Sequence, residues 1–120
     1  MRKFLVIAYT TLSLLFIHGC SKADTNVDFT SQEAVIIDVR TVDEFNSGHL
    51  SRAERVDWQT IQVAAMEMNL NKDQPILLYC RSGSRAGKAQ GLLKKMGFTN
   101  VHNLGGVSDA SRLTKDIIIR

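Results

Sequence analysis

The fold is decided by the stretch Pro75-Ile76-Leu77-Leu78-Tyr79-Cys80-Arg81-Ser82-Gly83-Ser84-Arg85, in which an apolar run leads into a short loop. Residues 76–80 have the length and composition of a strand that is covered on both faces. A helical pattern begins at Ser84. The backbone N–H groups of the loop and the helix dipole favour negative charge on Cys80, and Arg85 adds a fixed positive charge. We therefore interpret Cys80 as a nucleophilic thiolate rather than as core filler.

Strand and helix patterns alternate along the rest of the chain, which predicts right-handed crossovers and a parallel sheet. The expected strands are 34–39, 54–56, 76–80 and 100–104, and the expected helices are a short one from Thr41, then 58–70, 84–96 and a helical tail, 108–120, whose Ile117-Ile118-Ile119 packs on the sheet. Asp38-Val39-Arg40, the Cys80 loop and Gly105-Gly106 all fall at the C-terminal ends of expected strands. Because ligands of open α/β sheets bind at the carboxyl ends of the strands, we expect the site at this edge.

Residues 1–19 have the features of a signal peptide. Two basic residues precede an uncharged apolar stretch, 4–17, that is too short to span a bilayer comfortably. The sequence Ile17-His18-Gly19-Cys20 resembles a bacterial lipoprotein cleavage box, which implies cleavage before Cys20 and lipid attachment to it. We therefore expect an exported, periplasmic protein anchored to a bacterial membrane through Cys20. Cleavage nearby by an ordinary signal peptidase, or retention of the segment as a weak anchor, is the alternative.

The remaining chain divides into a polar tether, 20–28, and one domain, 29–120. Removing the two basic residues of the signal from the 15 in the chain leaves 13 against 12 acidic residues, so the net charge falls from +3 to about +1. Without a basic run, nucleic-acid binding has no support. The three histidines have no ligand spacing with Cys80, so we predict no metal and no cofactor. A disulfide between Cys20 and Cys80 is the alternative to a functional thiol, and lipidation of Cys20 would remove it.

Several blocks, in this order and spacing, resemble the single-domain rhodanese family of sulfurtransferases. They are Val35-Ile36-Ile37-Asp38-Val39-Arg40, Glu44-Phe45, Gly48-His49-Leu50, Ala53, Leu78-Tyr79-Cys80-Arg81-Ser82-Gly83-Ser84-Arg85, Gly97-Phe98-Thr99-Asn100-Val101 and Leu104-Gly105-Gly106. The resemblance runs from about Phe29 to Val107. It implies an α/β rhodanese fold, a five-stranded parallel sheet with helices on both faces. It also implies that Cys80 takes a sulfane sulfur from thiosulfate or a similar donor as a persulfide and passes it to cyanide or a thiol.

The loop supplies the expected substrate-binding residues, which are Arg81, Ser82, Gly83, Ser84 and Arg85. Gly83 allows the backbone to curl so that N–H groups converge on the sulfur. The planar guanidinium of Arg85 matches the sulfonate of a donor, and an ion pair with Asp38 is its alternative role. Arg81 is expected at the rim, where it attracts anions or is simply solvated.

Two further residues are expected to support the loop. Asp38 is expected to orient it through hydrogen bonds, and Arg40 either contacts substrate or forms an ion pair with Asp43 or Glu44. His49, in the Gly-His-Leu turn, is expected to be a structural hydrogen-bonding residue, with a Cys-His dyad as the alternative.

Other functions remain open at this point. A cysteine phosphatase needs arginine six positions after cysteine, whereas Arg85 lies five positions after Cys80, so the loop is one residue short. A non-catalytic sulfur carrier or binding module is the second alternative, and the intact Cys80 disfavours an inert one. A thiol redox protein is the third, and it lacks a nearby resolving cysteine.

Overall fold

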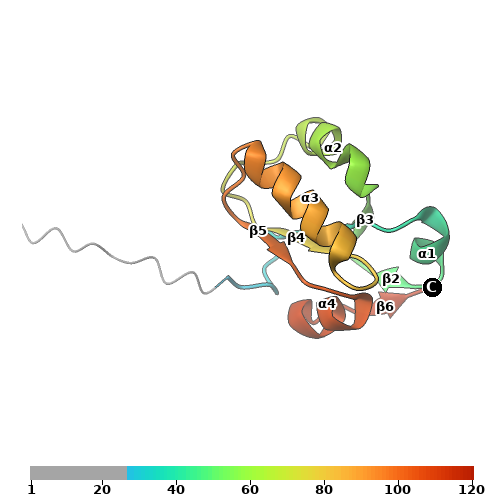
Figure 1. Ribbon diagram of the computed structural model, residues 1–120. Coiled ribbons are helices and arrows are strands. Elements are labelled where there is room, and N and C mark those ends of the chain that lie inside the picture. Colours follow the sequence, from blue (N-terminus) through green and yellow to red (C-terminus); the bar gives the residue numbers. More distant parts are fainter. Residues whose placement is uncertain (1–26) are drawn as a thin grey trace, which may run out of the picture.

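A parallel sheet forms the centre of the computed structural model, which describes residues 27–120 (Figure 1). Its four strands lie in the order β3-β1-β4-β5. Their bounds are Val35–Asp38 for β1, Glu54–Arg55 for β3, Ile76–Tyr79 for β4 and Val101–Asn103 for β5. The register pairs Asp38 with Tyr79, and Leu78 with Asn103. Strands β1, β4 and β5 therefore end at nearly the same level, which places the residues after them along one edge.

Helices cover both faces of the sheet, as the sequence predicts. The helical segments are α1 (Val42–Asn46), the 3₁₀ turn η1 (Trp58–Thr60), α2 (Ile61–Glu67), α3 (Ser84–Lys95) and α4 (Val107–Thr114). In Figure 1, α2 and α3 lie on one side of the sheet and α4 lies on the other. No helix within residues 27–120 has the length and hydropathy needed to cross a bilayer. The predicted signal (1–19) and Cys20 lie outside the described residues.

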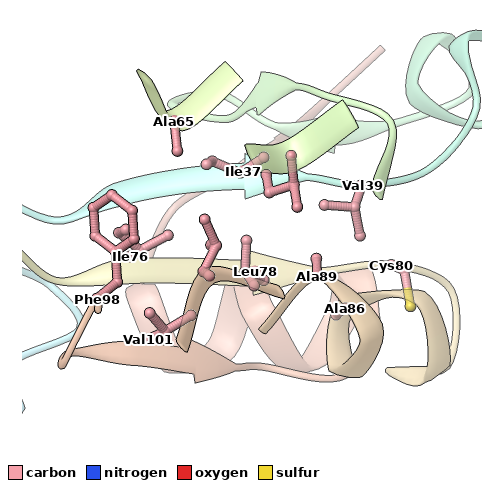
Figure 2. Packing of buried hydrophobic residues seen from close by; sticks show 12 residues of the cluster. Ile37, Val39, Ala65, Ile76, Leu78, Cys80, Ala86, Ala89, Phe98 and Val101 are labelled. Carbon is pink, nitrogen blue, oxygen red and sulfur yellow. The ribbon is translucent and has the colours of Figure 1, made fainter. Parts of the chain in front are cut away.

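The core is split into two clusters because side chains alternate along β4. Ile76 and Leu78 contribute to the cluster on the α2 and α3 side, together with Ala89 and Leu93 of α3 (Figure 2). The other cluster contains Leu77 and Tyr79, which pack toward α4 on the opposite face. All four side chains of β4 are buried. An uninterrupted apolar strand with both faces covered is therefore what the Pro75–Cys80 stretch specifies.

The expectation of five parallel strands is wrong in number. The described residues form four parallel strands and a separate antiparallel ladder, in which β2 (His49–Leu50) pairs with β6 (Ile118–Ile119). Ahead of β1 the chain turns, because the Asp28 side chain accepts hydrogen bonds from the Thr30 N–H at 2.9 Å and from its hydroxyl at 2.6 Å. Such local side-chain bonds compete with a strand ladder, so no further strand forms there.

The predicted helical tail, 108–120, is correct only for its first half. Helix α4 ends at Thr114, and Lys115 adopts a left-handed conformation with φ +57°. The Asp116 carboxylate then accepts a hydrogen bond from the Arg52 N–H at 2.8 Å, which draws the chain across to β2. The isoleucines that follow do not pack on the sheet as expected, since Ile117 is 67% exposed.

The helix predicted over 58–70 is also shorter than expected. It begins as the 3₁₀ turn η1 and continues as α2 only to Glu67, and Asn69 then has φ +52°. Asp57 precedes it without making a side-chain cap, because its carboxylate binds Arg55 at 2.8 Å instead. The expected short strand at 54–56 and the helix at 84–96 are confirmed within a residue.

Replacing Leu78 with alanine should lower the free energy of unfolding by about 2–5 kcal/mol, because the side chain is completely buried and its loss leaves a cavity in the core. Val63→Ala is the matched control, since Val63 is 52% exposed and surface changes stay within about 0.5 kcal/mol. Urea unfolding of both variants measures the difference. Equal losses in the two variants would contradict the described core.

Candidate active site

Cys80 lies at the point where β4 ends and the chain turns toward α3. Its N–H donates to the Gly105 carbonyl at 3.0 Å, which ties the cysteine to the segment after β5. The residue is only 1% exposed, and Figure 2 shows it at the end of the strand beside Ala86 of α3. The sulfur is therefore held at the carboxyl edge of the sheet, where the sequence predicts the site.

Backbone amides stabilise the Cys80 sulfur as an anion. Burial by itself would raise the pKa of the Cys80 thiol, but hydrogen bonding from the backbone N–H groups of Ala86, Ser82, Gly83 and Arg85 outweighs it and leaves the pKa below the ordinary value. The Gly83 N–H lies 3.0 Å from Sγ. A thiolate held by a ring of amides is a ready nucleophile, and it does not need a separate base.

Gly83 and the glycine pair after β5 allow this loop to close. Gly83 has φ +92°, a left-handed conformation that other residues adopt only with strain. A side chain on Gly106 would place its Cβ only 2.8 Å from the Arg81 carbonyl oxygen. Gly105-Gly106 therefore provides the close contact on which the Cys80 loop rests, in agreement with its predicted place at this edge.

Asn103, the last residue of β5, is a site residue that the sequence did not reveal. Its side-chain amide donates to the Gly83 carbonyl at 2.8 Å, and its side-chain oxygen accepts from the Gly105 N–H at 3.0 Å. Asn103 thus links the Cys80 loop, through Gly83, to the segment after β5, through Gly105. The available signal was an amide residue at the end of a strand, two positions before a glycine pair.

Arg85 makes a contact that neither sequence alternative anticipated. Its two terminal nitrogens bind the two Glu44 carboxylate oxygens, each at 2.8 Å, so the predicted pairing with Asp38 does not occur. Arg85 chiefly causes the pKa of Glu44 to fall to about 2, so Glu44 is ionised at neutral pH. Thr41, where the short helix is expected to begin, caps α1 by accepting from the Glu44 N–H, and its hydroxyl donates to the Glu44 carboxylate at 3.1 Å. The first turn of α1 is thereby attached to α3.

Arg40 and Asp38 form a buried pair behind the site. The Arg40 guanidinium reaches Asp38 Oδ2 at 2.6 Å and also donates to the Gly48 carbonyl at 2.7 Å. The expected ion pair of Arg40 with Asp43 or Glu44 is therefore wrong. The Asp38 side chain accepts hydrogen bonds from Arg40 rather than from the cysteine loop. Arg40 lies only two residues after Asp38, so both its backbone N–H and its guanidinium are within hydrogen-bonding distance of the carboxylate.

The remaining predicted residues lie around the mouth of the loop. Arg81, Ser82 and Ser84 are exposed, and within residues 27–120 the Arg81 guanidinium has no ion-pair partner. His49 stacks on Phe45 with ring centroids 3.5 Å apart, and its Nδ1 lies 2.8 Å from the Phe45 carbonyl oxygen. These contacts fit the structural role predicted for His49. No cluster of three potential metal ligands occurs in the described part of the chain.

This chain belongs to the rhodanese-like family, because residues 22–112 match the Rhodanese-like domain. Solved structures agree with that assignment. The Rhodanese_3-like domain of the Alr3790 protein from Anabaena is 26% identical, with a TM-score of 0.61 over 72% of this chain and 98% of that one. A rhodanese with anions from E. coli is 28% identical, with a TM-score of 0.58 over 63% of this chain and 89% of that one.

Curated relatives carry several names. Uncharacterized protein YqhL of Bacillus subtilis is 31% identical over 83% of this chain and 79% of its own length. Thiosulfate sulfurtransferase PspE of Escherichia coli K12 is 29% identical over 61% of this chain and 70% of its own. The tRNA uridine(34) hydroxylase of Erwinia tasmaniensis is 28% identical, and this chain spans only 28% of its length. Proteins similar to this chain therefore carry names for more than one activity.

Replacing Asn103 with alanine should raise the pKa of Cys80, because the carbonyl of Gly83 and the amides around the sulfur lose their support. At neutral pH the thiolate fraction should fall, since a higher pKa favours the protonated thiol. Titration of the thiolate by its ultraviolet absorbance, with Cys80→Ser subtracted, measures the pKa.

The matched control is Asn100→Ala, at the residue just before β5, where the side-chain amide donates to the Asp73 carbonyl at 3.2 Å. The pKa of Cys80 in this control variant should equal the pKa of Cys80 in the unaltered protein. Equal pKa values in the Asn103 variant and the unaltered protein would show that Asn103 does not position the loop.

Proposed function

We propose that this rhodanese-like protein is a sulfurtransferase, which moves a sulfane sulfur from thiosulfate or a similar donor to a thiophilic acceptor such as cyanide or a thiol. The observation that carries the proposal is the Cys80 sulfur, buried at the carboxyl edge of the sheet with backbone N–H groups directed at it. That environment favours a thiolate and equally favours a persulfide anion in the same place.

The reaction has two steps. The Cys80 thiolate attacks the outer sulfur of thiosulfate and forms a new S–S bond, while the bond between the two sulfurs of thiosulfate breaks and its electron pair leaves with sulfite. An acceptor thiolate or cyanide then attacks the terminal sulfur of the persulfide and restores the Cys80 thiolate. Neither step requires an external oxidant, metal or proton donor. We propose that Arg81, with the amides of residues 82–84, binds the donor's oxyanion, whereas the Arg85 guanidinium is already bound by Glu44.

Loop length favours sulfur transfer over phosphate-ester hydrolysis. Arg85 follows Cys80 by five positions, and the Gly83 amide already lies 3.0 Å from the sulfur. A loop drawn this closely around one atom suits a terminal sulfur better than a phosphoryl group, which needs a wider ring of amides. The relatives named thiosulfate sulfurtransferase PspE and rhodanese with anions are consistent with this choice.

Incubation of the protein with thiosulfate should add one sulfur atom to its intact mass, and cyanide should then remove it. Cys80→Ser should show no gain, because the oxygen nucleophile is not ionised in the loop. Cyanide-dependent turnover should follow ping-pong kinetics. Hydrolysis of p-nitrophenyl phosphate without any sulfur gain would favour the phosphatase alternative. Full biological activity of Cys80→Ser would favour a binding module.

We further propose that the protein is exported and attached to a bacterial membrane by a lipid on Cys20, with residues 20–28 as the tether. Only the sequence of the signal-like segment supports this step. Mass spectrometry of the N-terminal peptide from membrane fractions should show cleavage before Cys20 and a diacylglyceryl modification. Cys20→Ala should lose the lipid and, because the cleavage box is removed, should keep an uncleaved N-terminus; cleavage of that variant at the same position as the unaltered protein would contradict lipid attachment.

A further inference from the structure

The cation that the sequence assigns to donor binding, Arg85, is already bound by a carboxylate. Arg85 contributes its backbone N–H to the Cys80 environment, while its guanidinium is held by Glu44 through two hydrogen bonds of 2.8 Å each. The pair is only partly solvated, with 27% of the Arg85 side chain and 30% of the Glu44 side chain exposed. The Thr41 hydroxyl fixes the same carboxylate from the other side. Glu44 is therefore held in place and does not swing freely at the surface.

Three of the arginines around the site are paired with carboxylates. Arg40 is paired with Asp38 and Arg55 with Asp57, and within residues 27–120 only Arg81 of the loop lacks an acidic partner. A dianionic donor that reaches Arg85 therefore meets the Glu44 carboxylate beside the guanidinium. Each additional negative charge on the donor increases its repulsion by Glu44. The attraction between the donor and Arg85 is weak, because the Glu44 carboxylate already balances the arginine charge.

We infer that Glu44 is a specificity-determining residue, which disfavours dianionic donors such as thiosulfate relative to donors of lower charge by occupying the Arg85 guanidinium. The inference rests on the proposed sulfurtransferase function. It points to thiosulfonate or persulfide donors as the substrate class that this site accepts most readily. Nothing in the sequence motif alone distinguishes donors in this way, because the distinction arises from the contact between α1 and α3.

Methanethiosulfonate anion is a suitable probe of lower charge, because it delivers the same sulfur with one negative charge fewer. The Cys80 thiolate attacks its terminal sulfur, the S–S bond of the probe breaks, and the electron pair leaves with methanesulfinate. The product at Cys80 is the same persulfide that thiosulfate gives. Donor charge can therefore be varied while the enzyme product is kept constant.

The experiment compares single-turnover sulfur transfer from the two donors, followed by the intact mass of the full chain. Glu44→Gln keeps the shape of the side chain and removes its charge, so Arg85 becomes available to the donor. The ratio of the thiosulfate rate constant to the methanethiosulfonate rate constant should rise about fivefold to tenfold, as expected for one charge at close range in a partly solvated site.

Asp43→Asn is the matched control, because Asp43 is exposed on the same helix and makes no ion pair within the described residues. It removes one charge without releasing Arg85, so its donor ratio should stay within about twofold of the unaltered protein. Glu44→Ala should reproduce the increase, which provides a second variant if Glu44→Gln does not fold.

Adding Glu44→Gln to an Arg85→Gln background tests whether Glu44 acts through the arginine. The increase in donor ratio should nearly disappear there, because no guanidinium is left to release. An unchanged donor ratio in both Glu44 variants, or an equal increase in the Arg85→Gln background, would overturn the inference. Absence of sulfur gain from both donors in the unaltered protein would instead overturn the proposed function, and with it the inference.

Discussion

The hydrogen bonding of backbone amides to one buried sulfur is the constraint on which the rest of the structure depends. Burial of Cys80 opposes its ionisation, and the four backbone amides hydrogen-bonded to its sulfur reverse the balance, so the pKa falls. These amides converge only because Gly83 has φ +92°. The loop can rest on the next strand only because Gly106 has no side chain where the Arg81 carbonyl approaches. The side-chain hydrogen bonds of Asn103 hold this loop against the segment after β5.

Two arginine–carboxylate pairs then attach α1 to the loop region. The Arg40–Asp38 pair is buried, and such a pair is weak support for stability in itself, because the desolvation of two charges offsets their attraction. Its additional hydrogen bond to the Gly48 carbonyl fixes the end of α1. The Arg85–Glu44 pair fixes the beginning of α1 against α3. Together they determine where a short helix with no buried residue lies.

The sequence predicts those parts of the fold that depend on local pattern. The apolar run of β4, the helix after Ser84 and the cap at Thr41 are all encoded by neighbouring residues, and so is the position of Cys80 at the sheet edge. The ion-pair partners could not be predicted, because several acids stand at similar sequence distance from each arginine. Arg85 pairs with Glu44 rather than with Asp38 because the tertiary structure brings α1 to the start of α3.

Tertiary contacts, rather than local sequence pattern, also decide the course of the C-terminal region and the role of Asn103. Three consecutive isoleucines indicate a buried segment by composition, yet a left-handed Lys115 and the hydrogen bond of Asp116 to Arg52 direct them into the exposed ladder with β2. Asn103 has no feature of its own that marks it, since its importance lies in the two backbone groups that it joins across the site. Hydrogen bonds from a side chain to the backbone, such as these, leave no periodic signal in the sequence.

The way in which the sulfur is stabilised also has a consequence for the chemistry. The groups that lower the pKa of Cys80 are backbone N–H groups, whereas the guanidinium of Arg85 is largely neutralised by Glu44. Fixed dipoles around a buried sulfur act over short distances and are screened by salt much less than exposed side-chain charges. Anion stabilisation at the sulfur is thus separate from anion attraction at the mouth of the site. In the proposed sulfur transfer, surface charges would therefore set the donor preference without changing the nucleophile.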